Sequence, residues 1–273
     1  MQVTLAVMCY NQEQFILDTL RGDFAQDYDG LTILISDDHS PDGTYEVIRN
    51  FLNGYNGPHN VILNRNAPNL GLIDHVNHLF TLAKGSDLLI YNAGDDISEP
   101  HRVSRLASEF QAHNPLLIHT DVLDMHEDGR LWGRQRERQR AKKVMDFDLA
   151  HAAKVNSSCL GATCAWSPEL IDIFGPITEK NAIEDRVFYF RSRLMNRTLY
   201  LDEKLLRYRR GVGLTAKKAG DTGYDRRYLI MDIASYRQRL ADTRCVAPER
   251  GDIIAALEHK IAKSERALEA LAG

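Results

Sequence analysis

The chain has 273 residues, of which 44% are hydrophobic and 26% charged, and its formal net charge is -4. This length and composition support a full hydrophobic core in one large domain or two small ones. Because binding to phosphates needs positive charge and the chain has no basic excess, we expect no nucleic acid partner.

The first half of the chain alternates short apolar runs with segments of helical periodicity. Runs bounded by polar turns predict strands, and apolar residues at helical spacing predict helices between them. The expected strands are 3–9, 31–36, 61–63 and 88–92, and the expected helices are 13–20, 44–52 and 72–83. Such alternation is typical of a doubly wound, mostly parallel α/β sheet of the nucleotide-binding type.

The pattern changes after Asp96. A helix at 100–113, a strand at 116–123 and a turn at 127–129 indicate a mixed second half. Residues 217–273 have helical periodicity, with apolar positions close to one face. We expect this face either to pack on the body of the protein or to form a homo-oligomer with a second subunit.

The segment 130–143 is rich in lysine and arginine and poor in apolar residues. A solvated loop is the simplest interpretation of such a run. Two functional alternatives remain, because a basic loop beside an acidic site can close over a diphosphate or rest on an anionic membrane surface.

The start of the chain and the cysteines indicate a cytoplasmic protein. Residues 1–11 lack the basic and apolar regions of a secretory signal, and no later apolar run is long enough to span a bilayer. No two cysteines form a Cys-x-x-Cys pair, which favours buried free thiols over a zinc site or a disulfide. The four are Cys9, Cys159, Cys164 and Cys245.

Two of the predicted strands end in a pair of aspartates, Asp37 with Asp38 and Asp95 with Asp96. Ligands in open α/β sheets bind outside the carboxyl ends of the strands, and adjacent carboxylates repel unless a ligand compensates them. The first pair suits hydrogen bonds from a nucleoside. The second follows Gly94, which permits close backbone approach, and suits a divalent metal bound to a diphosphate.

Several segments, in order along the chain, resemble the motifs of the family-2 glycosyltransferases, whose fold is called GT-A. They are residues 7–13, 35–40, 69–77, 92–100, 182–186 and 206–215. The resemblance implies a GT-A-like domain over 1–216, with a nucleotide-binding half at 1–98 and an acceptor half at 99–216. A C-terminal helical extension at 217–273 would follow it.

The resemblance also implies roles for individual residues. It makes Asp96, together with Asp95, the ligands of Mn²⁺ or Mg²⁺, and it makes Asp185 the catalytic base with Glu184 orienting the acceptor or the base. The nucleotide-binding positions would be Cys9, Tyr10, Asn11, Glu13, Asp37, Asp38, Asn69, Gly71 and Asp95.

Trp166, Glu184 and Asp185 each have a second interpretation. Trp166 and Arg209 are candidate acceptor contacts, but a core position is equally expected for the tryptophan. An acid pair such as Glu184–Asp185 is also common at a helix N-terminus, where the helix dipole favours it. The order of the upstream motifs favours the catalytic interpretation.

The chain departs from the family pattern at two positions. Ala93 stands where an acidic residue often precedes the metal aspartates, and Gly211 stands where many relatives have a histidine that can reach the metal. We therefore expect Asp95 and Asp96 to be the only carboxylate ligands, so that metal affinity depends on the donor's diphosphate.

The resemblance implies an inverting glycosyltransferase that moves a sugar from a UDP- or dTDP-sugar to a hydroxyl of a glycan or lipid-linked acceptor. Synthesis of a surface polysaccharide or glycoconjugate, with peripheral contact at the inner face of the membrane, would fit that activity. One alternative is a non-catalytic scaffold that binds nucleotide sugars. A sugar-phosphate nucleotidyltransferase is disfavoured, since residues 8–12 lack a glycine-rich phosphate loop.

Overall fold

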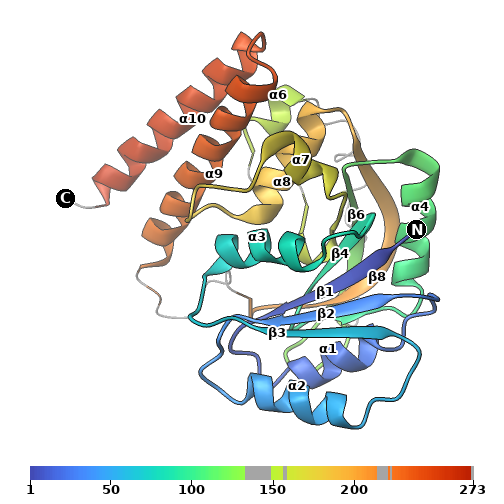
Figure 1. Cartoon of the computed structure of the whole chain (residues 1–273). Helices are drawn as coiled ribbons and strands as arrows, with labels where there is room; N and C mark the ends of the chain where they lie inside the picture. The colour runs from blue at the N-terminus through green and yellow to red at the C-terminus, as the bar shows by residue number, and fades with distance from the viewer. Residues whose placement is uncertain (133–148, 156–158, 214–220, 222, 272–273) are drawn as a thin grey trace.

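Eight strands form one sheet in the computed structural model, which describes residues 1–132, 149–155, 159–213, 221 and 223–271 (Figure 1). The strand order is β3-β2-β1-β4-β7-β6-β8-β5. Helices cover both faces of the sheet, so the expected α/β class is confirmed. Apart from its first three residues, the basic segment 130–143 lies outside the described residues.

The first half of the sheet is parallel, as the alternating pattern predicts. Its strands, in spatial order, are β3 (Asn60–Arg65), β2 (Thr32–Asp37), β1 (Val3–Cys9) and β4 (Leu88–Ala93). Because all four run in the same direction, their carboxyl ends lie along one edge of the sheet. Ligands of open α/β folds bind at that edge.

The second half of the sheet is mixed, as expected. β6 (Leu117–Met125) runs parallel to β8 (Thr198–Arg209). β7 (Ala165–Trp166) pairs antiparallel with both β4 and β6, and β5 (Ile97–Ser98) pairs antiparallel with β8. The sequence does not predict β8, because charged residues interrupt its apolar pattern.

The helices divide between the two faces of the sheet (Figure 1). Successive side chains of a strand point to opposite faces of the sheet, so Leu5 and Val7 of β1 pack on one face and Ala6 packs on the other. The first face is covered by α1 (Ile16–Asp23), α2 (Thr44–Asn53) and α4 (Arg102–His113). The second is covered by α3 (Leu72–Leu82), α7 (Glu169–Phe174) and α8 (Glu184–Leu194).

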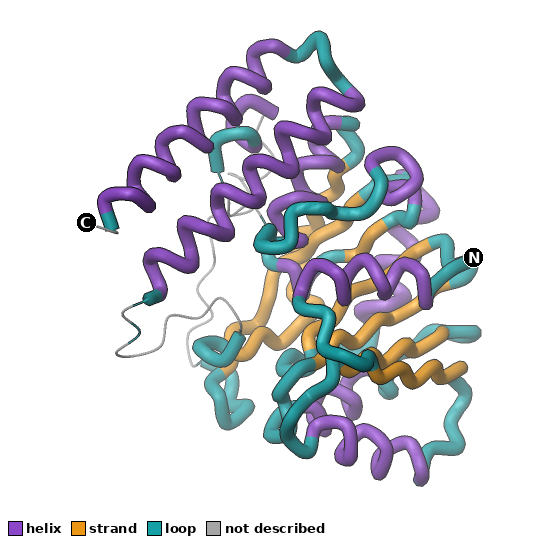
Figure 2. Tube along the Cα trace, turned by 60° about the vertical axis from the view of Figure 1, so that its left-hand side comes forward, coloured by secondary structure: helices purple, strands orange, loops and turns teal. Residues whose placement is uncertain are grey.

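The C-terminal extension is a pair of long helices, α9 (Tyr224–Val246) and α10 (Gly251–Ala270), side by side (Figure 2). Ile253 and Leu257 of α10 are buried in the same hydrophobic cluster as α8. This apolar face therefore packs on the body of the protein, the first of the two alternatives. Two short elements, α6 (Leu149–Ala152) and η1 (Gly161–Thr163), lie between β6 and β7 in sequence.

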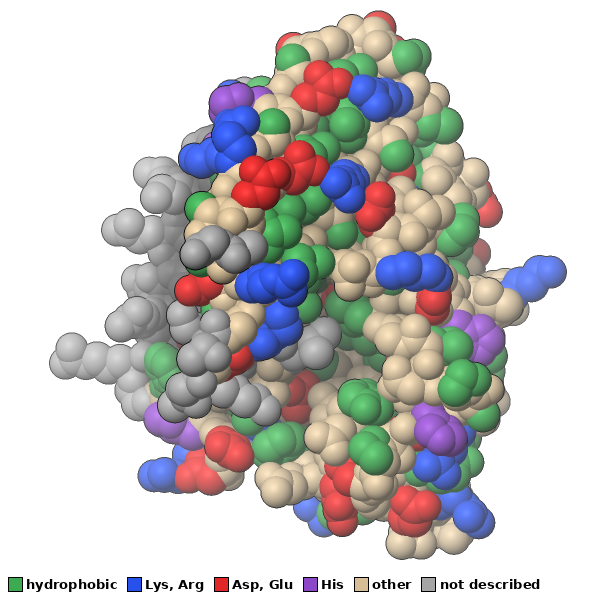
Figure 3. Space-filling view, turned by 90° about the vertical axis from the view of Figure 1, so that its left-hand side faces the viewer, with side chains coloured by type: hydrophobic (Ala, Val, Ile, Leu, Met, Phe, Trp, Pro, Cys, Tyr) green, Lys and Arg blue, Asp and Glu red, His purple; other side chains and the backbone are tan. Residues whose placement is uncertain are grey.

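The outer surface of the extension is polar. Figure 3 shows acidic and basic side chains close together on this side of the molecule. Exposed ion pairs join the two helices, Arg237 with Glu265 and Arg244 with Glu258. None of the described helices combines the length and the apolar character that a bilayer crossing requires.

All four cysteines are free thiols, in agreement with the sequence analysis. Cys9, Cys159 and Cys164 are buried, as expected. Cys245 on α9 is exposed instead. The expectation of burial is wrong there because this position faces away from the core that α9 and α8 share.

A buried ion pair joins α9 to α8. Arg191 Nε and Nη2 donate to the two carboxylate oxygens of Asp242, at 2.8 and 2.9 Å, and the side chains are 0% and 3% exposed. Such a bidentate pair is geometrically specific, and removing one partner leaves a buried charge without compensation.

We expect Asp242→Ala to lower the free energy of unfolding by about 3–5 kcal/mol, because Arg191 would remain buried and charged. Glu265→Ala, which removes the exposed partner of Arg237, is the matched control and should cost less than about 1 kcal/mol. Urea denaturation followed by circular dichroism measures both. Equal losses for the two variants would contradict a structural role for the buried pair.

Candidate active site

The two aspartate pairs lie close to the same edge of the sheet. Asp37 ends β2 and is followed by Asp38, while Asp95 and Asp96 follow the end of β4, and β1 lies between these two strands. The sequence analysis placed both pairs at strand ends, and this placement is confirmed. Their surroundings differ, however, and indicate different roles.

The first pair has partners within the protein. The Asp38 carboxylate accepts hydrogen bonds from the backbone N–H of Leu70 at 2.8 Å and of Gly71 at 2.9 Å, and from Asn66 Nδ2 at 2.9 Å. Asn69 Nδ2 donates to the Asp38 carbonyl at 2.6 Å. Gly71 has a φ of 76°, a conformation that favours glycine. Asp38 therefore shapes the loop that carries Asn69 and Gly71.

Asp37 is likewise committed to internal contacts. It is fully buried, accepts a hydrogen bond from the backbone N–H of Ser40 at 3.1 Å, and lies 3.3 Å from Arg65 Nε. The carboxylates of this pair thus order the loops after β2 and β3. Sequence alone does not distinguish such a role from direct contact with a nucleoside.

The loop after β1 is tied to the loop after β2. The backbone N–H of Asn11 donates to Ser40 Oγ at 2.9 Å, and Glu13 Oε2 accepts from the backbone N–H of Gly43 at 3.0 Å. Cys9 is buried, and its carbonyl accepts a hydrogen bond from the backbone N–H of Asp38 at 2.9 Å, so the structure does not favour a direct ligand contact there. Tyr10 is 50% exposed, which leaves its ring free to stack on a planar base.

The second pair lacks full compensation. Asp96 Oδ1 accepts from the backbone N–H of Arg209 at 2.8 Å, whereas Asp96 Oδ2 is buried without a hydrogen-bond partner among the described residues. Burial, followed by the charge of Asp95, raises the pKa of Asp96 well above its ordinary value. Burial also raises the pKa of Asp95, against which a hydrogen bond with Gln12 acts.

These carboxylates fit a divalent metal that is held partly by its substrate. The unpartnered oxygen of Asp96 and the repulsion between neighbouring carboxylates are what a cation would relieve. In the described part of the chain, no three His, Cys, Asp or Glu side chains converge as a metal site. Asp95 and Asp96 would therefore bind Mn²⁺ or Mg²⁺ together with phosphate oxygens and water.

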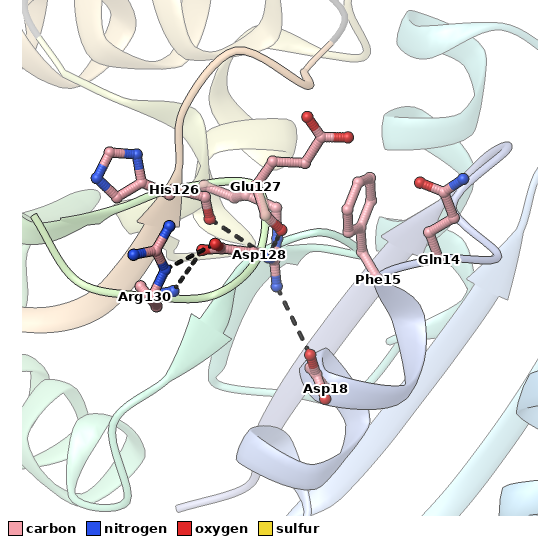
Figure 4. A pocket seen from close by; sticks show the side chains of 8 residues that line it. Gln14, Phe15, Asp18, His126, Glu127, Asp128 and Arg130 are labelled. Carbon is pink, nitrogen blue, oxygen red and sulfur yellow. Dashed lines mark hydrogen bonds and ion pairs between the residues drawn. The ribbon is translucent and has the colours of Figure 1, made fainter.

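Arg209 is buried beneath the loop after β4 that carries Asp95 and Asp96. Its Nε donates to the Asp95 carbonyl at 2.9 Å, and its guanidinium lies 4.8 Å from the ring centre of Phe15. It is 2% exposed and borders a cavity of about 560 Å³ that Asp18 and Glu127 also line (Figure 4). The structure does not favour the acceptor contact that the sequence analysis expected, because the guanidinium is occupied in supporting the loop.

Glu184 and Asp185 are the first two residues of α8. Asp185 Oδ2 accepts a hydrogen bond from the backbone N–H of Gly161 at 3.1 Å. Glu184 is 6% exposed, and its Oε2 has no hydrogen-bond partner among the described residues. Burial, followed by the charge of Asp185, raises the pKa of Glu184 to about 8. Burial also raises the pKa of Asp185, while Arg186 acts in the opposite direction.

Tyr91 connects the two sides of the site. Its phenol is buried, and burial together with four neighbouring negative charges raises its pKa well above the ordinary value. These charges belong to Glu184, Asp95, Asp96 and Asp185. All four carboxyl groups are therefore near enough to the phenol to act on its pKa. The sequence analysis missed Tyr91, whose only signal is its position near the end of β4.

Arg102 holds the backbone behind this region. It is fully buried, and its Nη2 donates to the carbonyls of Tyr91 at 2.7 Å and Ala162 at 2.6 Å, while Nη1 donates to Ser98 Oγ at 3.1 Å. Burial lowers its pKa to about 10, so it stays charged at neutral pH. This role could not be predicted from the sequence, because an arginine at a helix start is usually exposed.

Trp166 occupies the core beneath the site. Its side chain is 0% exposed and stacks on Tyr91, with ring centres 5.0 Å apart, and on Phe80 at 5.8 Å. A fully buried ring offers no surface to an acceptor sugar. The acceptor-wall expectation is therefore wrong, and the core alternative applies.

A family model described as glycosyl transferase family 2 matches residues 4–169. The chain belongs to this family. EpsE of Bacillus subtilis (strain 168), whose name describes a glycosyltransferase, is 26% identical to this chain over 129 residues. That match covers 47% of this chain and 45% of EpsE, so the chain matches less than half the length of this relative.

Solved structures of low sequence identity share the fold. S. aureus TarS 1–349 in complex with UDP-GlcNAc has a TM-score of 0.67 at 16% identity, covering 97% of this chain and 72% of that one. The mannosyltransferase PcManGT from Pyrobaculum calidifontis, in complex with GDP-Man and Mn²⁺, has a TM-score of 0.68 at 16% identity, covering 99% and 75%. The GT-A architecture expected for family 2 is therefore confirmed.

The raised pKa of Glu184 predicts a pH-dependent stability. Because its pKa is about 8 in the folded protein and near 4.5 when unfolded, the folded state binds more protons between these values. The free energy of unfolding should therefore fall as pH rises from 5 to 8. Glu184→Gln should remove roughly 2–4 kcal/mol of that fall.

Denaturation at several pH values checks this expectation. Glu46→Gln, at an exposed position of α2, is the control and should follow the wild-type pH dependence. If the Glu184→Gln and wild-type curves ran parallel between pH 5 and 8, Glu184 would not be the titrating group.

Proposed function

We propose that the protein is an inverting, metal-dependent glycosyltransferase that transfers a sugar from a nucleoside diphosphate sugar to an acceptor hydroxyl. The observation that carries this proposal is the placement of two buried carboxylate pairs beside β4. Asp95 and Asp96 follow the end of β4, and Asp185 accepts a hydrogen bond from Gly161 of η1, which Arg102 joins to β4. One pair suits the diphosphate and its metal, and the other suits proton removal. When the acceptor oxygen displaces the nucleoside diphosphate at a sugar carbon, the base and the metal must act on opposite sides of that carbon.

The nucleotide half would be formed by the loops after β1, β2 and β4. Tyr10 offers an exposed ring to the base, and the loop ordered by Asp38 presents Asn69 and Gly71 beside it. Asp95 and Asp96 would hold Mn²⁺ or Mg²⁺ against the diphosphate. A bound divalent metal offsets the negative charge that grows on the leaving nucleoside diphosphate.

The acceptor half would be formed by the start of α8 and by η1. Asp185 would remove the proton of the acceptor hydroxyl as its oxygen attacks the anomeric carbon from the face opposite the leaving group. The backbone N–H of Gly161 fixes one carboxylate oxygen of Asp185 and leaves the other for this proton. With a pKa of about 8, Glu184 is mostly protonated at neutral pH and can donate a hydrogen bond to the acceptor.

The donor and acceptor classes follow from chemistry and likeness. We propose a UDP- or dTDP-sugar as donor, and TarS bound to UDP-GlcNAc supports this class, although PcManGT is bound to GDP-Man. The acceptor would be a glycan or a lipid-linked glycan of a surface polysaccharide or glycoconjugate. Such a role would place the protein in the cytoplasm, with peripheral contact at the inner face of the membrane.

The direct test is donor cleavage with UDP-, dTDP- and GDP-sugars, Mn²⁺ and a panel of acceptors. Asp185→Asn should lower turnover by about 10²–10⁴, the contribution of a general base, while donor binding by calorimetry stays unchanged. Asp74→Asn, which removes an exposed partner of Lys180, is the control. Binding of donors without turnover by the wild type would instead indicate a scaffold, and release of pyrophosphate would indicate a nucleotidyltransferase.

The metal role of Asp96 has its own test. Asp96→Asn removes the charge that the cation would pair with, so half-saturation by Mn²⁺ in the presence of UDP should require more than tenfold higher metal. Calorimetric titration of Mn²⁺ into the UDP-bound protein measures this without turnover. Unchanged Mn²⁺ affinity would remove Asp96 from the metal site.

A further inference from the structure

The first turn of α8, which carries Glu184 and Asp185, has no side-chain cap of its own. Its preceding residue, Ile183, instead donates its backbone N–H to Ser235 Oγ on α9 at 3.1 Å. Ser235 is fully buried and donates its own hydroxyl proton to the Met231 carbonyl at 2.8 Å. The hydroxyl therefore fixes the start of α8 relative to α9.

A second side chain of α9 holds the backbone immediately after Asp185. Arg239 Nε donates to the carbonyl of Arg186 at 3.0 Å, and its Nη1 donates to the carbonyls of Val155 at 3.0 Å and Ala152 at 3.3 Å. Arg239 is 2% exposed. One guanidinium thus joins α9, α8 and the segment after α6.

We propose that Ser235, supported by Arg239, is a positioning residue that sets the placement of the carboxylates of Glu184 and Asp185 from the C-terminal extension. This inference rests on the proposed function. α8 and α9 both lie beyond residues 4–169, the part of the chain that the family model matches.

The geometry explains why such support matters. Asp185 is fixed on one side by the N–H of Gly161, and α9 fixes the backbone on the other side. A general base works only within hydrogen-bond reach of the proton, and a displacement of about 1 Å can cost up to 10²-fold in rate. Loss of the α9 contact should therefore slow the chemical step while the distant nucleotide loops keep their affinity.

The chain offers a matched pair of variants. Ser235 and Thr243 are both fully buried on α9, and each donates its hydroxyl at 2.8 Å to the carbonyl four residues earlier. Only Ser235 also accepts a hydrogen bond from α8. Ser235→Ala and Thr243→Ala therefore lose the same local bond, and they differ in the contact that the proposal invokes.

We expect Ser235→Ala to lower kcat roughly tenfold with little change in the donor KM, and Thr243→Ala to keep the wild-type kcat. Ser235→Thr, which keeps the hydroxyl, should restore kcat. Amide hydrogen exchange across 180–190 should be faster in Ser235→Ala than in Thr243→Ala, a readout that does not need activity. The acid limb of the kcat–pH profile should also move in Ser235→Ala alone.

The outcomes separate this inference from the proposed function. If the wild type transfers no sugar from any donor, the proposed function fails, while the exchange measurement still tests the contact. If the wild type is active and Ser235→Ala matches Thr243→Ala in kcat and in exchange, the positioning role is overturned. A fall in donor affinity without a fall in kcat would overturn it as well.

Discussion

The burial of carboxylates around Tyr91 is the constraint on which the rest of this structure depends. Burial raises the pKa of Asp95, Asp96, Asp185 and Glu184, so the protein must supply positive charge close to them. It does so with buried arginines from separate elements. Arg102 and Arg209 act on Asp96, and Arg186 and Arg239 act on Asp185.

The same arginines order the loops. A guanidinium has five N–H donors, and in Arg102, Arg209 and Arg239 at least one of them binds a backbone carbonyl. Arg102 joins the backbone of β4 to η1. Arg209 joins the loop that carries Asp95 to the turn after β6. Arg239 joins α8 to the segment after α6. Charge compensation and loop geometry therefore depend on the same side chains, and a change at one arginine affects both.

This coupling explains what sequence analysis could and could not predict. The strands β1, β2 and β4 and their terminal acids were predicted because apolar periodicity and turn residues are local signals. The burial of Arg209 was not predicted, and that of Trp166 was one of two alternatives, since both depend on elements that join only in three dimensions. The two-residue strand β7 is too short to have a period. The bonds from Leu70 and Gly71 to Asp38, which order the loop after β3, could not be predicted for the same reason.

The compensation within the protein is incomplete at two atoms, one on each side of the site. Asp96 Oδ2 and Glu184 Oε2 are buried without hydrogen-bond partners among the described residues. An unpaired buried oxygen is costly, so each favours a ligand that brings a cation or a proton donor. A metal-bound diphosphate would satisfy the first, and an acceptor hydroxyl would satisfy the second. In the proposed reaction, both oxygens would gain partners only when donor and acceptor are bound together, which would favour transfer between them over reaction of the donor alone.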